Sequence, residues 1–194
     1  MHTIKTLGIA SLFAALSLAP AAAENLIKIT EGEVGLALGN ARNEIIFSEG
    51  DSDIRFMMNR NGDNWYELQM ATPTHGLDYG LYWRIREEAV GGLLQKAYVT
   101  QYLAPSSGRF FYTIDLYSDS DATYHSYLVG HDATGAAYEF LDSYCFAGGY
   151  ILNPHIWESD GSLYIGGDGP RNESHPKYRL YWSEESQWFG YEAL

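Results

Sequence analysis

Hydrophobic and polar residues alternate with a period of two along most of the chain after residue 23. In residues 65–70, for example, Tyr66, Leu68 and Met70 fall on one face, because successive side chains of a strand point to opposite sides of a sheet. Turn residues separate such runs at roughly the 8–12-residue spacing of sandwiches, barrels and propeller blades. No run with helical periodicity reaches about 10 residues. The pattern therefore predicts an all-β fold of antiparallel strands.

Several neighbouring runs form predicted hairpins. Residues 94–103 and 109–117 are joined by the turn at Pro105–Gly108, and the second run directs Phe110, Tyr112, Ile114 and Leu116 inward. At the start of the domain, residues 26–30 and 34–38 are predicted as two strands joined at Glu31–Gly32. A polar turn, a glycine and then aromatic residues recur, but not at a constant interval. Both a β-sandwich and a small propeller-like arrangement fit this pattern.

The last hairpin has the clearest pattern of the chain. Two aromatic-rich runs flank the polar residues 183–186. Leu180 and Trp182 share one face of the first run, and Tyr181 lies on the other. We expect Trp182 to be buried and Tyr181 to face outward.

The first 23 residues have the features of an export signal. Lys5 precedes an apolar run at residues 7–18, which is too short to span a bilayer as a helix of about 20 residues. Ala21 and Ala23 suit a cleavage site. The sequence therefore predicts a cleaved signal peptide at 1–23 and a single all-β domain at 24–194, secreted or periplasmic and without membrane insertion.

The formal net charge of −13 limits the partners that the protein can have. It disfavours nucleic acid, whose binding needs clustered Lys and Arg, and it suits solubility or a cationic protein partner. Cys145 is the single cysteine and is flanked by Tyr144 and Phe146, so we expect a packed free thiol.

Motifs for catalysis and metal binding are largely missing from the sequence. It has no Gly-x-Ser-x-Gly motif, no His-x-His and no His-Glu-x-x-His. The acidic turns at 51–53, 59–63 and 119–121 offer oxygen atoms to calcium, but none continues into a complete calcium-binding loop. We therefore assign no catalytic residue, no metal and no cofactor, and favour a protein that is not an enzyme.

Aromatic residues are the remaining functional signal, with 16 Tyr and 5 Trp in the chain. Some strands carry aromatic residues on both faces. If one face is core, the other can bind a partner or a sugar, but a strand in the interior of a sandwich would show the same pattern. The candidate ligand-binding residues are Tyr181, Trp188 and Trp157. The favoured hypothesis is an exported binding protein, an acidic inhibitor or protective protein that caps a partner protein. The alternatives are a carbohydrate-binding module and a hydrolase with an unrecognised carboxylate site.

Overall fold

The computed structural model describes residues 24–35, 43–61, 65–72, 80–86, 94–118, 123–132, 134–143, 155–167 and 176–194. These residues form 13 strands and, as predicted, the described chain is all-β. The strands are β1 (Ile27–Gly35), β2 (Glu44–Glu49), β3 (Ser52–Asn61), β4 (Trp65–Ala71), β5 (Leu81–Arg86), β6 (Leu94–Ala104), β7 (Arg109–Ser118), β8 (Thr123–His131), β9 (Ala137–Asp142), β10 (His155–Ser159), β11 (Ser162–Gly166), β12 (Pro176–Ser183) and β13 (Trp188–Ala193).

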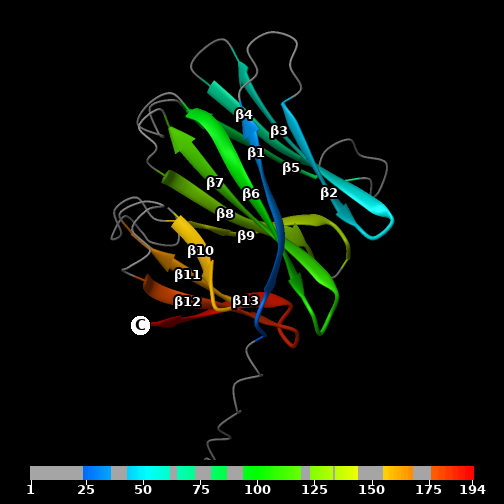
Figure 1. Cartoon of the computed structure of the whole chain (residues 1–194), viewed down its shortest axis with the longest axis vertical. Coiled ribbons are helices and arrows are strands. Elements are labelled where there is room, and N and C mark those ends of the chain that lie inside the picture. Colours follow the sequence, from blue (N-terminus) through cyan, green and yellow to red (C-terminus); the bar gives the residue numbers. More distant parts are fainter. Residues whose placement is uncertain are drawn as a thin grey trace, which may run out of the picture.

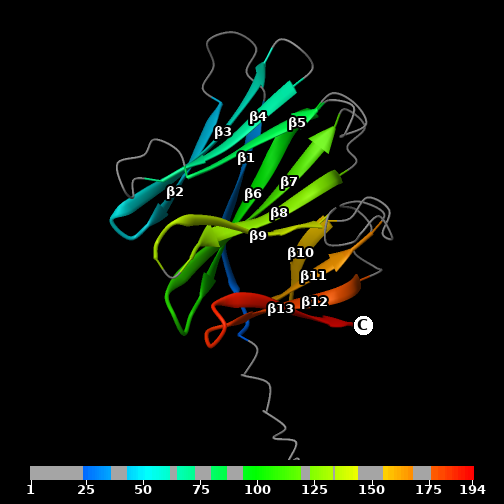
Figure 2. The ribbon, with the colours of Figure 1, turned by 180° about the vertical axis from the view of Figure 1, so that it is seen from behind.

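The strands form three antiparallel sheets in a sandwich-like arrangement (Figures 1 and 2). The central sheet has the order β1-β6-β7-β8-β9. An N-terminal sheet, β2-β3-β4-β5, and a C-terminal sheet, β10-β11-β12-β13, pack against it. Apart from the β1–β6 pair, all paired strands are consecutive in sequence, which explains why local patterns predict so many of the hairpins. Across these described ranges no helix is long and apolar enough to cross a bilayer.

The central sheet is buried on both faces. Tyr112, Ile114 and Leu116 of β7 pack with the N-terminal sheet in one core. Phe111, on the opposite face of the same strand, belongs to a second core shared with the C-terminal sheet. The sequence predicted the first face as inward and missed the second. A strand covered on both sides loses the simple contrast between a polar and an apolar face.

The prediction of two strands at the start of the domain is wrong in its details. β1 runs without a break through Glu31 and Gly32 and pairs with β6 along its length. Gly32 serves close packing instead of a turn, since a Cβ atom there would lie 1.7 Å from Cδ1 of Ile45 on β2. A glycine inside a strand often marks such an approach of a neighbouring chain segment.

The C-terminal hairpin is confirmed. β12 and β13 pair with Trp182 opposite Phe189, and Trp182 is fully buried. Tyr181 lies half-buried on the other face.

Some predicted features lie outside the described residues. These are the signal peptide at 1–23, Cys145, the acidic turn at 119–121, and parts of the predicted strands 77–85 and 150–157.

Candidate functional site

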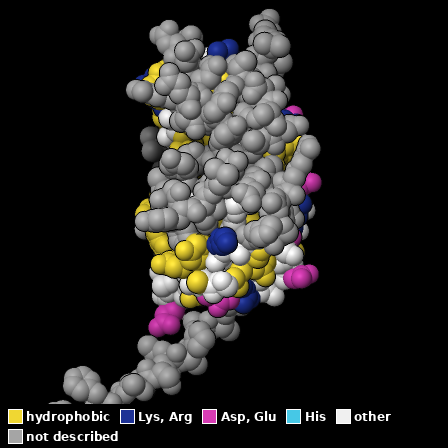
Figure 3. All heavy atoms as spheres, turned by 90° about the vertical axis from the view of Figure 1, so that its left-hand side faces the viewer, with side chains coloured by type: hydrophobic (Ala, Val, Ile, Leu, Met, Phe, Trp, Pro, Cys, Tyr) yellow, Lys and Arg dark blue, Asp and Glu magenta, His cyan; other side chains and the backbone are white. Residues whose placement is uncertain are grey.

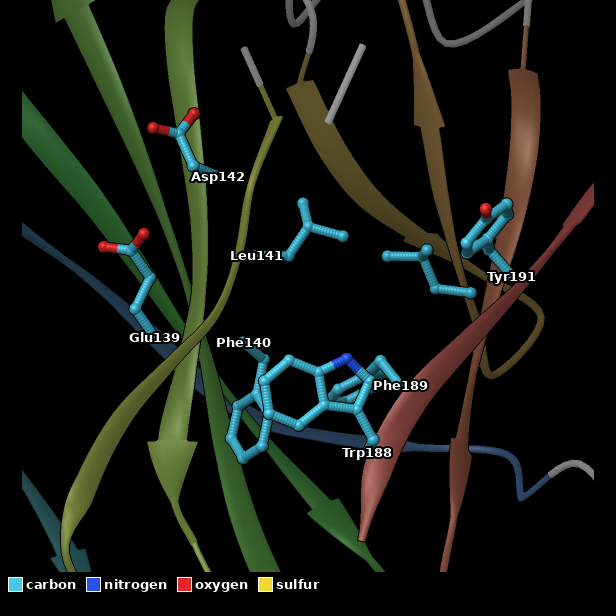
Figure 4. A pocket seen from close by; sticks show the side chains of 8 residues that line it. Glu139, Phe140, Leu141, Asp142, Trp188, Phe189 and Tyr191 are labelled. Carbon is cyan, nitrogen blue, oxygen red and sulfur yellow. The ribbon is translucent and has the colours of Figure 1, made fainter. Parts of the chain in front are cut away.

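An open groove of about 480 Å³ lies between the central and the C-terminal sheets. Strand β9 forms one side and β13 the other, as Figure 4 shows. This volume falls within the roughly 300–1,000 Å³ that is common for ligand sites. The groove is lined by Glu139, Phe140, Leu141, Asp142, Leu180, Trp188, Phe189 and Tyr191.

The aromatic wall of the groove is anchored in the core. Trp188 is 42% exposed, and its ring packs edge-on against the rings of Tyr138 and Phe140 at 5.1 and 5.4 Å. Phe140 in turn contacts the buried ring of Phe189 at 5.6 Å. Tyr191 is 59% exposed. Because Trp188 packs on the buried ring of Phe140, the aromatic wall is formed without a ligand.

The C-terminal sheet also exposes apolar surface outside the groove. In Figure 3, hydrophobic side chains gather toward the end of the molecule where this sheet lies, with acidic and basic side chains between them. Leu194, which follows β13, is 64% exposed.

Both strands that flank the groove are edge strands. Within the described residues, β9 pairs only with β8 and β13 only with β12. The first half of β9 is covered from the side by β5, because Trp83 donates a hydrogen bond to Glu139. The outer edge of β13 has no such cover among the described strands. An open edge presents backbone N–H and C=O groups to which another chain can bind.

The carboxylates of the groove do not form a hydrolytic pair. Glu139 and Asp142 both come from β9, and Figure 4 shows them along that one strand. A glycosidase needs two carboxylates that face each other across the substrate, and none of the residues lining the groove supplies an acid from β13. Nowhere in the described chain do three or more metal-ligating side chains form a group that could hold a metal ion.

The three candidate ligand-binding residues lie in three different places. Trp188 is in the groove. Tyr181 lies on the other face of the C-terminal sheet and covers Gly190, where a Cβ atom would be 2.4 Å from the tyrosine Cζ. Trp157 is only 8% exposed and lines a separate, smaller cavity. The fold therefore brings together none of the three.

Sequence reasoning missed the contribution of β9 to the groove. The sequence predicts a hairpin of residues 124–129 with residues 136–141, and the pairing of β8 with β9 confirms it. Phe140 and Glu139 gain their importance from the neighbouring β13, about 50 residues later in the chain. No local signal in the sequence indicates that β9 and β13 lie close together, although one residue of the opposite wall, Trp188, is among the candidate ligand-binding residues.

A second polar cluster lies between the N-terminal and central sheets. The Tyr112 hydroxyl donates to Glu49 at 2.6 Å, and Nδ1 of His131 lies 3.5 Å from the other oxygen of Glu49. Gln101 donates to the Tyr112 hydroxyl at 3.2 Å and to the Ser48 carbonyl at 3.1 Å. Burial raises the pKa of Glu49, against the opposing effects of Tyr112 and His131. These contacts join the two sheets.

The raised pKa of Glu49 gives a prediction for the Glu49→Gln variant. A carboxyl group whose pKa is higher in the folded state stabilises the fold below its unfolded value of 4.5 and loses that contribution as pH rises. The glutamine does not titrate, and its carbonyl can still accept from Tyr112. Above pH 4.5 we expect the free energy of unfolding of Glu49→Gln to rise relative to that of the wild type. Urea unfolding at a series of pH values measures this difference, and a gap that does not change with pH would contradict the assignment.

Comparisons with known proteins leave the site to be interpreted from its own chemistry. The chain matches no protein-family model, no curated protein and no solved structure.

Proposed function

We propose that the protein is a non-enzymatic binding protein that acts outside the cytoplasm. Its groove between β9 and β13 receives an extended segment of a cationic partner protein, which the protein caps as an acidic inhibitor or protective factor. One observation carries the proposal: a preformed aromatic groove runs between two edge strands, one of them open.

Strand addition is the binding mode that this geometry favours. A partner segment laid along the outer edge of β13 would form main-chain hydrogen bonds with it, and its alternate side chains would enter the groove. Trp188 and Tyr191 offer aromatic contact surface, which interface hot spots commonly use. The net charge of −13 favours basic residues in the partner segment.

Carbohydrate binding is the second candidate, because exposed aromatic rings beside carboxylates also suit sugars. The arrangement of the rings favours a protein. A platform for stacked sugars presents ring faces in a flat strip, whereas Trp188 meets Tyr138 and Phe140 at 72° and 70°. The aromatic rings therefore form an uneven wall and not the flat strip that stacked sugars need.

The test is a selection of displayed random peptides on the purified domain 24–194, followed by calorimetry with the selected peptides. We expect extended sequences that contain Lys or Arg. The Trp188→Ala variant should bind them at least about tenfold more weakly, since a central aromatic hot spot is worth more than about 1.4 kcal/mol.

Tyr181→Ala is the matched control, because Tyr181 does not line the groove and its ring covers Gly190. It should leave the affinity unchanged. Equal losses in both variants, or no loss with Trp188→Ala, would reject the groove as the binding site. A parallel screen with soluble oligosaccharides covers the second candidate: binding there, with no peptide selected, would favour the carbohydrate-binding alternative.

A further inference from the structure

The hydrogen-bonding register of the C-terminal hairpin determines which backbone groups of β13 point outward. The Leu194 N–H donates to the Lys177 carbonyl at 3.0 Å. In an antiparallel pair of strands, hydrogen-bonded and non-hydrogen-bonded residue pairs alternate. Along the unbroken register of β12 with β13, Ala193 and Phe189 therefore both belong to non-hydrogen-bonded pairs. Their N–H and C=O groups point away from β12, to the edge with which no described strand pairs.

A strand added antiparallel to this edge would pair its residues directly with Phe189 and Ala193. Antiparallel pairing is slightly more stable per residue than parallel pairing, and it is the arrangement of every named strand pair in the described chain. Directly paired residues point their side chains to the same face of a sheet. The added residues opposite Phe189 and Ala193 would therefore point to the side of the sheet on which Phe189 lines the groove (Figure 4).

The groove is apolar on the side of the C-terminal sheet. Its lining includes the apolar residues Phe140, Leu141, Leu180 and Phe189. Leu180 and Phe189 are 3% and 5% exposed, and the two acids of the lining come from β9, across the groove from β13. A Lys or Arg side chain placed against these apolar residues would lose hydration that they cannot replace. The positions opposite Phe189 and Ala193 therefore favour apolar side chains.

The positions between them have different surroundings. The register places these residues of the added strand beside Gly190 and Glu192, with their side chains on the other face of the sheet. The Glu192 side chain is 51% exposed and pairs with Arg179. A Lys or Arg side chain at such a position keeps its hydration, and the net charge of −13 attracts it. The basic residues of a partner segment fit these positions.

We propose that the partner segment is an amphipathic strand that adds antiparallel to β13. It places apolar side chains opposite Phe189 and Ala193, and it carries Lys or Arg at the positions between them. This inference rests on the proposed function and specifies the sequence pattern and the register of the partner. It also links two properties of each partner residue: those whose side chains enter the groove are those whose N–H groups donate to β13.

The first test compares two short acetylated peptides of equal composition by calorimetry on the purified protein. Val and Lys alternate in one peptide, and the Val residues form a single block in the other. We expect the alternating peptide to bind at least about tenfold more tightly, because only this peptide can direct its Val side chains into the groove and its Lys side chains away from it. N-methylation of one central Val should weaken binding about tenfold, since it removes an N–H group that donates to β13. N-methylation of the neighbouring Lys is the matched control and should leave the affinity unchanged.

The second test changes the edge of β13 without changing the groove. Ala193 is exposed and does not line the groove. Ala193→Pro removes an N–H group that points away from β12, so the β12–β13 ladder should remain, as for proline on other edge strands. We expect this variant to bind the alternating peptide about tenfold more weakly, whereas Ala193→Val, which keeps the N–H group, should bind it as the wild type does. Thermal melts establish that both variants are folded, and the two N-methylated peptides test the register on the wild type if Ala193→Pro unfolds.

The inference and the proposed function can fail separately. Equal binding of the two peptides, a loss on Lys methylation that equals or exceeds the loss on Val methylation, or full binding to folded Ala193→Pro would each overturn the inference. If Trp188→Ala still weakens the binding of selected peptides in that case, the groove remains the binding site and only the register and the pattern are wrong. If selection yields no peptide and neither designed peptide binds, the inference and the proposed function both fall.

Discussion

Trp182→Ala should lower the free energy of unfolding by about 3–5 kcal/mol, the range for emptying a buried aromatic site. Trp182 is fully buried in the second core. Its ring lies 4.7 Å from that of Phe111, 5.7 Å from Phe140 and 5.2 Å from Phe189. These rings come from three strands of two sheets, so the cavity cannot close by moving one neighbour. The indole N–H also donates to Glu184 in the hairpin loop. The loss is measured by urea unfolding.

Trp188→Ala serves as the control of matched chemistry for this measurement. It removes the same side chain from the partner strand of the same hairpin, but at a position that is 42% exposed. It should therefore cost much less stability than Trp182→Ala. Tyr181→Ala should also cost less, because Tyr181 is half-buried and its ring rests on Gly190 outside the core. If Tyr181→Ala unfolds the domain while Trp182→Ala does not, the two faces of the hairpin have been assigned in reverse.

Acid should destabilise the protein through His155, by about 2 kcal/mol between pH 7 and pH 5. Burial lowers the pKa of His155 to about 4 from an ordinary value of 6.5. Below pH 6.5 the unfolded chain binds a proton at this site that the folded protein excludes, so stability falls as pH decreases towards the folded value. This destabilisation disappears only above pH 6.5, the pKa of His155 in the unfolded chain.

The His155→Phe variant isolates this effect. Phenylalanine can keep the stacking on Trp157 and has no ring nitrogens to leave without partners. We expect the variant to be at least as stable as the wild type at pH 7 and to lose less stability than the wild type on going to pH 5. Urea unfolding of both proteins at the two pH values gives the comparison, in which other titrating groups cancel. Parallel losses in the two proteins would show that His155 is protonated in the folded state at pH 5.

Local sequence patterns specify the strands and hairpins that depend only on neighbours in the chain. The alternation in residues 65–70 buried Tyr66, Leu68 and Met70 as expected. The hairpins of β6 with β7 and of β12 with β13 also formed as expected, because short turns bring consecutive strands together. The inward direction of Trp182 followed from the same alternation. These features need only a period of two and a turn signal.

Which strands are buried on both faces, and where a ligand could bind, depends on how the sheets pack against one another. β7 buries Phe111 as well as Ile114 because a third sheet packs on its second face. Glycine is common in turns, yet Gly32 lies within β1, because Ile45 packs onto it. The groove exists because β9 and β13 end their sheets next to each other. Packing between sheets joins residues far apart in the chain, and alternation along a single strand carries no information about its neighbour in the next layer.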